Sequence, residues 1–458
     1  MDEKDESPKM NRRDFLKALG GASALTLAAC GGKDSTEAVA AEKDVPRDKM
    51  TYRTNPSTGD KVSLLGYGCM RLPTLNGEPG GEIDQETVNR LTDYALGHGV
   101  NYFDTSPAYC KGRSEGAMGI ALSRHPRDTY YIATKLSNFS PDTWSREKSI
   151  EMYRNSFKEL RTDHIDYLLL HGIGMGGMDA LRGRYLDNGV LDFLLAERKA
   201  GRIRNLGFSY HGDVDCFDYL LAQDIRWNFV QIQLNYVDWK HAKETNAWNT
   251  NAEYLYGELV KRNIPAVIME PLLGGRLANL NFRSIEQLKA LEPDATIASW
   301  AFRFAGSQPD VMTVLSGMTY MENLQENIRT YSPLKPLSGK ERDALERCAK
   351  TILDYPLVQC NACQYCMPCP YGLDIPGIFT HYNKCLNEGN YSSDIHDEKY
   401  EKARRAFLIG YDRSVPRLRQ ANHCTGCRRC VEHCPQRIDI PKEMQRIDQY
   451  VEELKLNG

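Results

Sequence analysis

The sequence predicts an α/β fold in which a (β/α)8 TIM barrel is followed by a small, mainly α-helical domain. Two observations lead to this prediction. Eight short apolar runs alternate with longer amphipathic stretches, and the cysteines are concentrated near the C-terminus: of 14 cysteines, only Cys30, Cys69, Cys110 and Cys216 precede Cys348. A chain of 458 residues is long enough for one large domain and one smaller one.

Charge narrows the range of partners. The net charge is -3, from 58 basic and 61 acidic residues, and the body of the chain contains no long run of one sign. Such a balance does not favour a polyanion, so we expect no nucleic-acid partner. The sequence instead predicts a small-molecule or protein partner.

Residues 1–30 resemble a twin-arginine (Tat) export signal. The stretch Asn11-Arg12-Arg13-Asp14-Phe15-Leu16-Lys17 matches the pattern R-R-x-F-L-K, and the mildly apolar run Ala18 to Ala29 is too short to span a bilayer. A basic, disordered N-terminus is the alternative. Leu27-Ala28-Ala29-Cys30 also resembles a lipoprotein processing box, in which Cys30 would carry a lipid anchor; ordinary signal peptidase could cut the same run. We expect a periplasmic protein or a membrane-anchored lipoprotein, or a cytoplasmic protein if the leader does not function.

Residues 31–50 read as a charged linker, and residues 51–336 as the barrel. A turn cluster between Thr51–Arg53 and Lys61–Ser63 predicts a hairpin. A helix is expected over 84–97, capped by Asp84. The expected strands are Leu64–Leu65, Asn101–Phe103, Tyr130–Ala133, Ile165–Leu170, Arg204–Phe208, Phe229–Leu234, Ala266–Met269 and Met312–Leu315. A doubly wound sheet is the alternative, but no G-x-G-x-x-G follows the first strand.

Residues capable of chemistry follow these apolar runs. Asp104 ends the second run, Lys135 follows the third, His171 ends the fourth, and Tyr109 lies in the loop after Asp104. Each alone has an ordinary alternative as a helix cap, a packing residue or a core histidine. Strand ends in a barrel share one rim, so the four are expected to meet in a single pocket.

These four residues resemble the catalytic tetrad of the aldo-keto reductases. Neighbouring stretches agree, including Leu65-Gly66-Tyr67-Gly68-Cys69-Met70-Arg71-Leu72 and Leu206-Gly207-Phe208-Ser209. The resemblance implies NAD(P)-dependent interconversion of a carbonyl and an alcohol. Tyr109 would be the proton donor, with its pKa lowered by Lys135; Asp104 would hold Lys135 charged; and His171 would orient the carbonyl.

The same resemblance implies a nicotinamide site. Ser209 and Gln231 would hold the carboxamide and Tyr236 would contact the ring or line the pocket, although Tyr210 stands where the family usually has Asn. The stretch containing Pro271, Leu272 and Gly274 would border the pyrophosphate. The adenosine-phosphate site would be formed by Ser316, Gly317, Met318, Glu326 and Asn327. NADP is the family's commoner cofactor, and NAD stays open because no Lys or Arg lies between Ser316 and Asn327.

Residues 337–458 carry two cysteine motifs. The first motif contains Cys360, Cys363, Cys366 and Cys369-Pro370, and the second contains Cys424, Cys427, Cys430 and Cys434-Pro435. The second motif has the bacterial ferredoxin spacing, and the first has one residue fewer before its last cysteine. This resembles a helical dicluster ferredoxin-type domain with two [4Fe–4S] clusters. By that analogy Cys434 would complete the first cluster and Cys369 the second. Zinc and, less readily, disulfides are the alternatives.

We therefore expect an exported oxidoreductase that couples hydride chemistry in the barrel to electron transfer through two iron–sulfur clusters, with a redox partner protein. The alternative is an iron–sulfur electron-transfer protein whose barrel is mainly a binding platform, because nicotinamide cofactors are scarce outside the cytoplasm.

Overall fold

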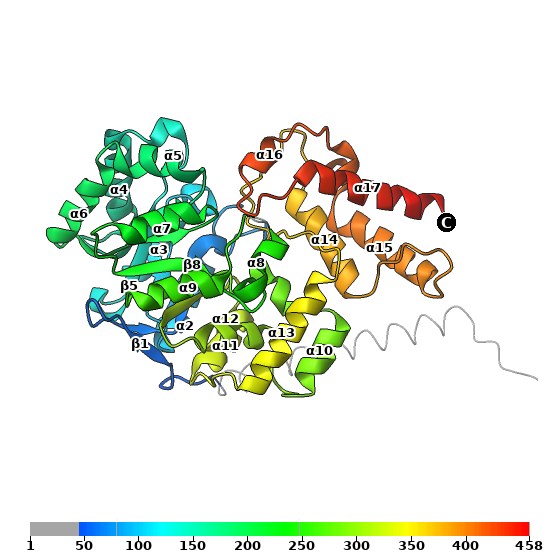
Figure 1. Ribbon diagram of the computed structural model, residues 1–458, viewed down its shortest axis with the longest axis horizontal. Coiled ribbons are helices and arrows are strands. Elements are labelled where there is room, and N and C mark those ends of the chain that lie inside the picture. The colour runs from blue at the N-terminus through cyan, green and yellow to red at the C-terminus, as the bar shows by residue number, and fades with distance from the viewer. Residues whose placement is uncertain (1–44, 79, 247, 458) are drawn as a thin grey trace, which may run out of the picture. The chain divides into compact units, whose positions relative to one another are not determined.

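The computed structural model describes residues 45–78, 80–246 and 248–457. The proposed leader, Cys30 and most of the linker lie outside the described residues, so these expectations stay predictions. Residues Arg47–Gly458 form one compact unit, in which an eight-stranded barrel is followed by a cysteine-rich helical region (Figure 1).

The barrel is closed and all its neighbouring strands are parallel. The strand order is β10-β3-β4-β5-β6-β7-β8-β9. The strands are β3 (Leu65–Gly68), β4 (Tyr102–Asp104), β5 (Tyr131–Leu136), β6 (Ile165–Ile173), β7 (Ile203–Tyr210), β8 (Phe229–Gln233), β9 (Ala266–Met269) and β10 (Val311–Ser316). All eight predicted strands are confirmed, and the doubly wound sheet is excluded.

The predicted hairpin is also confirmed. Strands β1 (Tyr52–Thr54) and β2 (Lys61–Ser63) pair antiparallel, with Tyr52 opposite Ser63. Val62 is fully buried and belongs to the core inside the barrel, together with Tyr102, Tyr167 and Phe229. The hairpin therefore inserts an apolar side chain into the barrel core.

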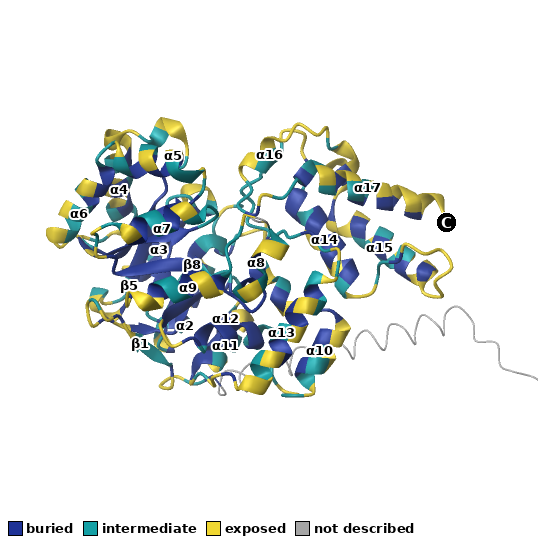
Figure 2. Ribbon diagram, in the orientation of Figure 1, coloured by how far each residue is buried: buried dark blue, intermediate teal, exposed yellow. Residues whose placement is uncertain are grey.

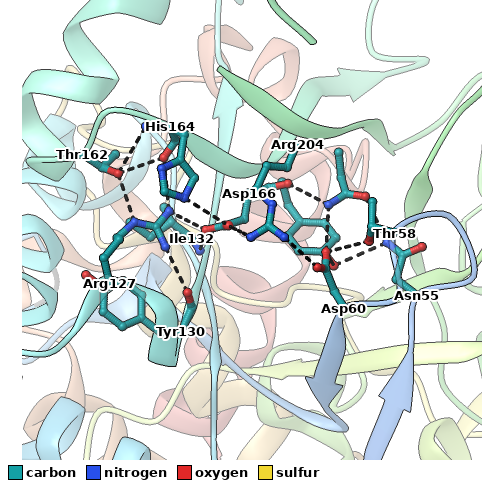
Figure 3. A network of polar contacts seen from close by, with 12 residues as sticks. Asn55, Thr58, Asp60, Arg127, Tyr130, Ile132, Thr162, His164, Asp166 and Arg204 are labelled. Atoms are coloured by element: carbon teal, nitrogen blue, oxygen red, sulfur yellow. Dashed lines mark hydrogen bonds and ion pairs between the residues drawn. The ribbon is translucent and has the colours of Figure 1, made fainter. Parts of the chain in front are cut away.

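A polar network lies at the amino-terminal ends of the central strands (Figure 3). Asp166 accepts from Arg127 at 2.5 Å and from Arg204 at 3.0 Å, and Arg204 also pairs with Asp60 at 3.0 Å. Because the Asp166 side chain is completely buried, these partners offset the cost of placing a carboxylate in the interior. A network at this end of a barrel serves stability, since chemistry occurs at the opposite end.

Helices cover the outside of the barrel. Helix α2 begins after Asp84, whose carboxylate accepts from the N–H of Thr87, as predicted. The helices that follow the strands are α2 (Gln85–Gly97), α3 (Ser114–Leu122), α4 (Arg146–Leu160), α5 (Gly177–Leu181), α6 (Val190–Lys199), α7 (Val214–Ala222), α8 (Asp238–Thr245), α9 (Ala252–Lys261), α10 (Phe282–Lys289), α11 (Ile297–Gly306) and α12 (Met321–Tyr331).

After the barrel, helix α13 (Gly339–Leu353) begins at a capping box formed by Ser338 and Glu341 and packs on α8 and α10. A separate apolar core starts at Val358. It is built from α14 (Ile375–Asn387), α15 (Tyr400–Ser414) and α17 (Ile440–Leu456), with the short α16 (Arg429–Glu432) beside them. Figure 2 shows that these helices bury one face and expose the other.

Helix α17 buries Met444, Ile447, Val451 and Leu454 in this core. Cys348 and Cys385 are buried in apolar surroundings, as expected of core thiols. No disulfide joins the cysteines of the described part. In that part, no helix is both long enough and apolar enough to cross a membrane.

Candidate active site

The four predicted catalytic residues come together at the carboxyl ends of β4, β5 and β6. Lys135 donates from Nζ to Asp104 Oδ1 at 2.5 Å and to the carbonyl oxygen of Thr105 at 2.9 Å. Both side chains of this pair are almost fully buried. A pair desolvated to this degree has a fixed geometry, because separating the charges would leave each one unsatisfied.

Tyr109 lies above this pair, in a 3-10 turn spanning Tyr109–Gly112. The Lys135 Nζ is 4.8 Å from the centroid of the Tyr109 ring. The ring also meets the His171 imidazole edge to face, with 5.9 Å between their centroids. After Tyr109 the backbone takes positive φ at Cys110 and Lys111, a conformation that side chains other than glycine adopt at a cost.

His171 is held by two hydroxyl groups. Its Nδ1 lies 2.6 Å from Ser137 Oγ and 3.4 Å from Ser106 Oγ. Burial first, and then the positive charges of Lys135 and Arg184, hold the pKa of His171 well below its usual value. A neutral imidazole that accepts from Ser137 at Nδ1 carries its proton on Nε2, so Nε2 is the atom that can donate a hydrogen bond.

The pKa of Tyr109 differs from the expectation. Lys135 was predicted to lower it, but burial raises it well above 10, and Asp104 and Tyr365 raise it further. The predicted direction is wrong for this structure because burial of the phenol is the largest effect on its pKa, and the carboxylate of Asp104 adds to that effect. Tyr109 therefore keeps its proton at neutral pH.

The strand-end residues assigned to the nicotinamide lie in different surroundings. Ser209 Oγ accepts from the N–H of Gly172 at 2.8 Å. The Oε1 atom of Gln231 is buried without a hydrogen-bond partner in the described part. Tyr236 packs edge to face on Phe304 of α11, with 6.2 Å between centroids, which places its ring among the outer helices. Tyr210 also turns outward, toward Thr250.

The residues assigned to the adenosine phosphate lie together where β10 leads into α12. Asn327 donates to Ser316 Oγ at 3.0 Å, the carbonyl of Met318 accepts from Tyr67, and Glu326 accepts from Thr296. Gly317 is exposed. No side chain caps the amino end of α12, so its first N–H groups remain available for an anion.

The first cysteine motif contacts the barrel rim beside the remaining cofactor residues. Pro271 is buried and Leu272 is partly buried after β9. Gly274 has φ +67, and a Cβ atom there would collide with the backbone of Asn361. Across the rim, Arg71 donates to the carbonyl oxygens of Asn361 at 2.7 Å and Ala362 at 3.4 Å.

No individual role was predicted for three polar residues of this region. Glu270 has φ +54, and burial raises its pKa while Arg71 partly offsets the effect. Tyr365, inside the first cysteine motif, is near enough to influence the pKa of Tyr109. His211 follows β7, and burial and Lys135 lower its pKa to about 4. A sequence signal existed for Glu270 and His211, since each is a polar residue just after a strand.

The eight motif cysteines fall into two groups. Cys360, Cys363, Cys366 and Cys434 line one small cavity, whose other walls include Ile375 and Phe379. Burial raises the pKa of Cys430 to about 11, and its thiol neighbours are Cys424, Cys369 and Cys427. Each group draws cysteines from both motifs, as the ferredoxin analogy implies, and the two ligand sets stay a prediction.

Among the described residues, no group of three or more His, Cys, Asp or Glu side chains is arranged to hold a metal ion. The thiols of the first group instead surround a cavity with apolar walls. Four cysteine thiols that line one cavity are the donor set that a thiolate-bound cluster requires.

Chemically active side chains at the carboxyl ends of successive parallel strands place this protein among the barrel enzymes. Comparison with known proteins narrows the class. The model of the aldo/keto reductase family matches residues 64–350, and the chain belongs to that family. It is an oxidoreductase of the aldo-keto reductase type.

Its similarity to individual relatives is distant. L-galactose dehydrogenase of Arabidopsis thaliana is 25% identical over 65% of this chain and 92% of the relative, and the uncharacterized oxidoreductase YqkF of Bacillus subtilis is 25% identical over 63% and 93%. Aldo-keto reductase AKR11C1 from Bacillus halodurans (holo form) has a TM-score of 0.52 and 23% identity over 65% of this chain and 96% of that one. The structural likeness supports the fold, and the family match ends at residue 350, before the cysteine motifs.

Proposed function

We propose that this protein is an exported, NAD(P)-dependent oxidoreductase that interconverts a carbonyl and an alcohol and exchanges electrons through two [4Fe–4S] clusters. The observation that carries the hydride chemistry is the convergence of Asp104, Tyr109, Lys135 and His171 at one end of the barrel.

The residues have distinct roles in carbonyl reduction. His171 would donate from Nε2 to the carbonyl oxygen and polarise it. Tyr109, which keeps its phenolic proton, would pass that proton to the oxygen as negative charge develops there. Lys135, fixed by Asp104, would stabilise the resulting phenolate. Bound nicotinamide supplies or accepts the hydride in this family.

Three observations support a nicotinamide site. Gln231 presents a buried, unpartnered carbonyl oxygen that could accept from a carboxamide N–H. The uncapped amino end of α12 suits a phosphate. Gly317 is exposed beside it. No side chain in these contacts separates NADP from NAD, and the family's commoner use favours NADP.

The cluster proposal is supported by the two groups of cysteines. Cys360, Cys363, Cys366 and Cys434 would hold one cluster, and Cys424, Cys427, Cys430 and Cys369 the other. The first four thiols line one cavity, which supports a group bound by all four. Each cluster would accept or release one electron at a time, which is the step that hydride chemistry alone does not provide.

A Tyr109→Phe variant tests the catalytic role. With iron and sulfide contents equal to wild type, we expect NADPH-dependent reduction of 4-nitrobenzaldehyde to fall by a factor of about 100 or more, since general acid catalysis contributes roughly 10²–10⁴. Unchanged reduction would refute the assignment. Anaerobic purification followed by iron and sulfide analysis tests the clusters, and zinc in their place would refute that part.

One observation favours the alternative, an electron-transfer protein whose barrel is a binding platform. The backbone of Asn361 packs against Gly274, in the segment that would border the pyrophosphate. Equilibrium binding of NADPH and NADH to the purified protein distinguishes the two functions. Absence of binding for both would favour the platform.

The export proposal rests on the twin-arginine pattern at Arg12 and Arg13, and anchoring rests on Cys30. Replacing both arginines by lysine should retain the protein in the cytoplasm, as measured by cell fractionation. Replacing Cys30 by alanine should release the protein from the membrane fraction if Cys30 is lipidated.

A further inference from the structure

The two cysteine groups differ in their distance from solvent. The first group lines an interior cavity, and its loop contacts the barrel rim through Asn361. In the second group Cys427 is exposed. Cys366 and Cys430, one from each group, pack against the same apolar core of the helical region. The first group is therefore the one nearer the barrel site, and the second group reaches the protein surface at Cys427.

Several arginines lie near the second cysteine group, which is exposed at Cys427. Arg428 and Arg429 lie between Cys427 and Cys430. Arg419 donates to the carbonyl of Gly372 at 3.3 Å, in the turn after Cys369. Arg417 presents its carbonyl oxygen to the ring of His423, 3.2 Å away, next to Cys424. We call Arg417, Arg419, Arg428 and Arg429, together with Leu418 and Cys427, the basic face.

The basic face is accessible and poorly neutralised. Its four arginines are all exposed, and Leu418 is 80% exposed. Arg417 pairs with Asp412 at 3.2 Å and Arg428 with Asp439 at 3.0 Å. Within the described residues, neither Arg419 nor Arg429 forms an ion pair. The face is thus positive in a chain whose net charge is -3, and the segments around α16 are largely exposed (Figure 2).

We propose that the basic face is the docking surface for an acidic electron-carrier protein that exchanges electrons with the second cysteine group. This inference rests on the proposed function, in which that group holds a cluster. Complementary charge would steer the carrier to Cys427 and set its orientation, and Leu418 would supply apolar contact among the charges. No bond is made or broken: one electron per encounter passes between the cluster and the carrier's own flavin or iron–sulfur centre.

An acidic protein is favoured over an anionic membrane because the arginines surround the most exposed cysteine of the second group. A membrane surface has no redox centre to place there. Binding to anionic lipid is therefore a competing outcome of the test.

The test uses the holoprotein, a flavodoxin of strongly acidic charge and, as an opposite probe, basic cytochrome c. The variant Arg417→Glu/Arg419→Glu/Arg429→Glu leaves the Arg428–Asp439 pair in place. Arg90→Glu/Arg154→Glu/Arg283→Glu, at exposed positions on α2, α4 and α10, is the control matched in net charge. Arg429→Glu alone serves if the triple variant fails to fold, and iron content reports on the integrity of each protein.

We expect wild type to bind the flavodoxin with an association rate that falls steeply as salt rises. The triple variant should lose at least tenfold in that rate at low salt, the control should stay within twofold, and cytochrome c should bind the triple variant better than wild type. Equal binding of flavodoxin to the triple variant and the control would overturn the proposal, as would salt-insensitive binding to wild type. Loss of binding to phosphatidylglycerol vesicles without loss of flavodoxin binding would assign the face to a membrane. If purified wild-type protein contained no iron, the proposed clusters would be refuted. Flavodoxin binding tests the basic face independently of that result.

Discussion

Arg71 donates a hydrogen bond of 2.7 Å to the carbonyl oxygen of Asn361, a residue 290 positions later in the chain. Arg71 ends the 3-10 turn after β3, and Asn361 directly follows the first motif cysteine. The bond joins the rim of the catalytic barrel to the loop that lines the cysteine cavity. The cysteine motif is therefore part of the surroundings of the barrel site.

Replacing Arg71 by alanine should loosen this connection. A charge-assisted hydrogen bond to a carbonyl contributes about 1.5–3 kcal/mol, so we expect faster amide hydrogen exchange in residues 360–366 and slower reduction of the clusters by substrate. Arg53→Ala is the control. Arg53 also donates to a backbone carbonyl at 2.7 Å, that of Pro309, but Arg53 belongs to the hairpin and not to the rim beside the cysteine motif. If both variants exchange like wild type in 360–366, the connection has no energetic importance.

Tyr365 is expected to position the substrate. It lies close enough to Tyr109 to raise its pKa, and it belongs to the loop that Arg71 holds. Removing a packed aromatic ring costs about 1 kcal/mol or more, so Tyr365→Ala should raise the KM for 4-nitrobenzaldehyde about five- to tenfold and leave the KM for NADPH within twofold. Tyr371→Ala, at a 52% exposed position in the same region, should behave like wild type. A Tyr365→Ala enzyme with unchanged KM and full iron content would exclude this role.

Ser137 should act as a positioning residue for His171. Its hydroxyl lies 2.6 Å from Nδ1, and by donating to this nitrogen it would favour the tautomer that has its proton on Nε2. We expect Ser137→Ala to lower kcat about tenfold with little change in KM, because the hydrogen bond from His171 strengthens in the transition state. Nitrogen NMR shifts of the His171 ring should then show a mixture of tautomers. The exposed Ser123→Ala change is the control, and a wild-type tautomer in Ser137→Ala would contradict the assignment.

The barrel could be predicted because each strand is a local apolar run and each helix a periodic one. Asp104, Lys135 and His171 were found from their places after those runs, since the strand ends of a barrel meet at one rim. The docking of Asn361 on Arg71 and Gly274 could not be predicted in this way. It uses backbone carbonyl groups, which carry no residue-type signature, and joins parts of the chain that no local pattern connects.

Two further differences have physical reasons. Tyr365 was overlooked because it occupies a spacer position between cysteines, where the motif restricts no residue type. The pKa of Tyr109 was predicted in the wrong direction because its burial depends on the C-terminal loop. The Asp104 charge beside Lys135 was known from the sequence, but its effect on Tyr109 depends on distances that only the folded site defines.

Glu115 should make the stability of the barrel depend on pH. This carboxyl on α3 accepts from Thr134 Oγ1 at 2.5 Å, and burial raises its pKa to about 7. Because the folded pKa lies above the ordinary value near 4.5, the folded state binds more protons than the unfolded state between those two values. Stability contributed by the protonated carboxyl is therefore present below about pH 4.5 and is lost as pH rises through about 7.

A Glu115→Gln variant tests this linkage, because it keeps an acceptor for Thr134 and removes the charge. A shift of this size corresponds to about 3 kcal/mol, so the variant should be more stable than wild type at pH 8 by up to that amount, and the difference should vanish as the pH falls below about 4.5. Urea unfolding at both pH values measures it, with the exposed Glu151→Gln on α4 as the control. A difference between Glu115→Gln and wild type that stayed constant with pH would mean that Glu115 ionises normally in the fold.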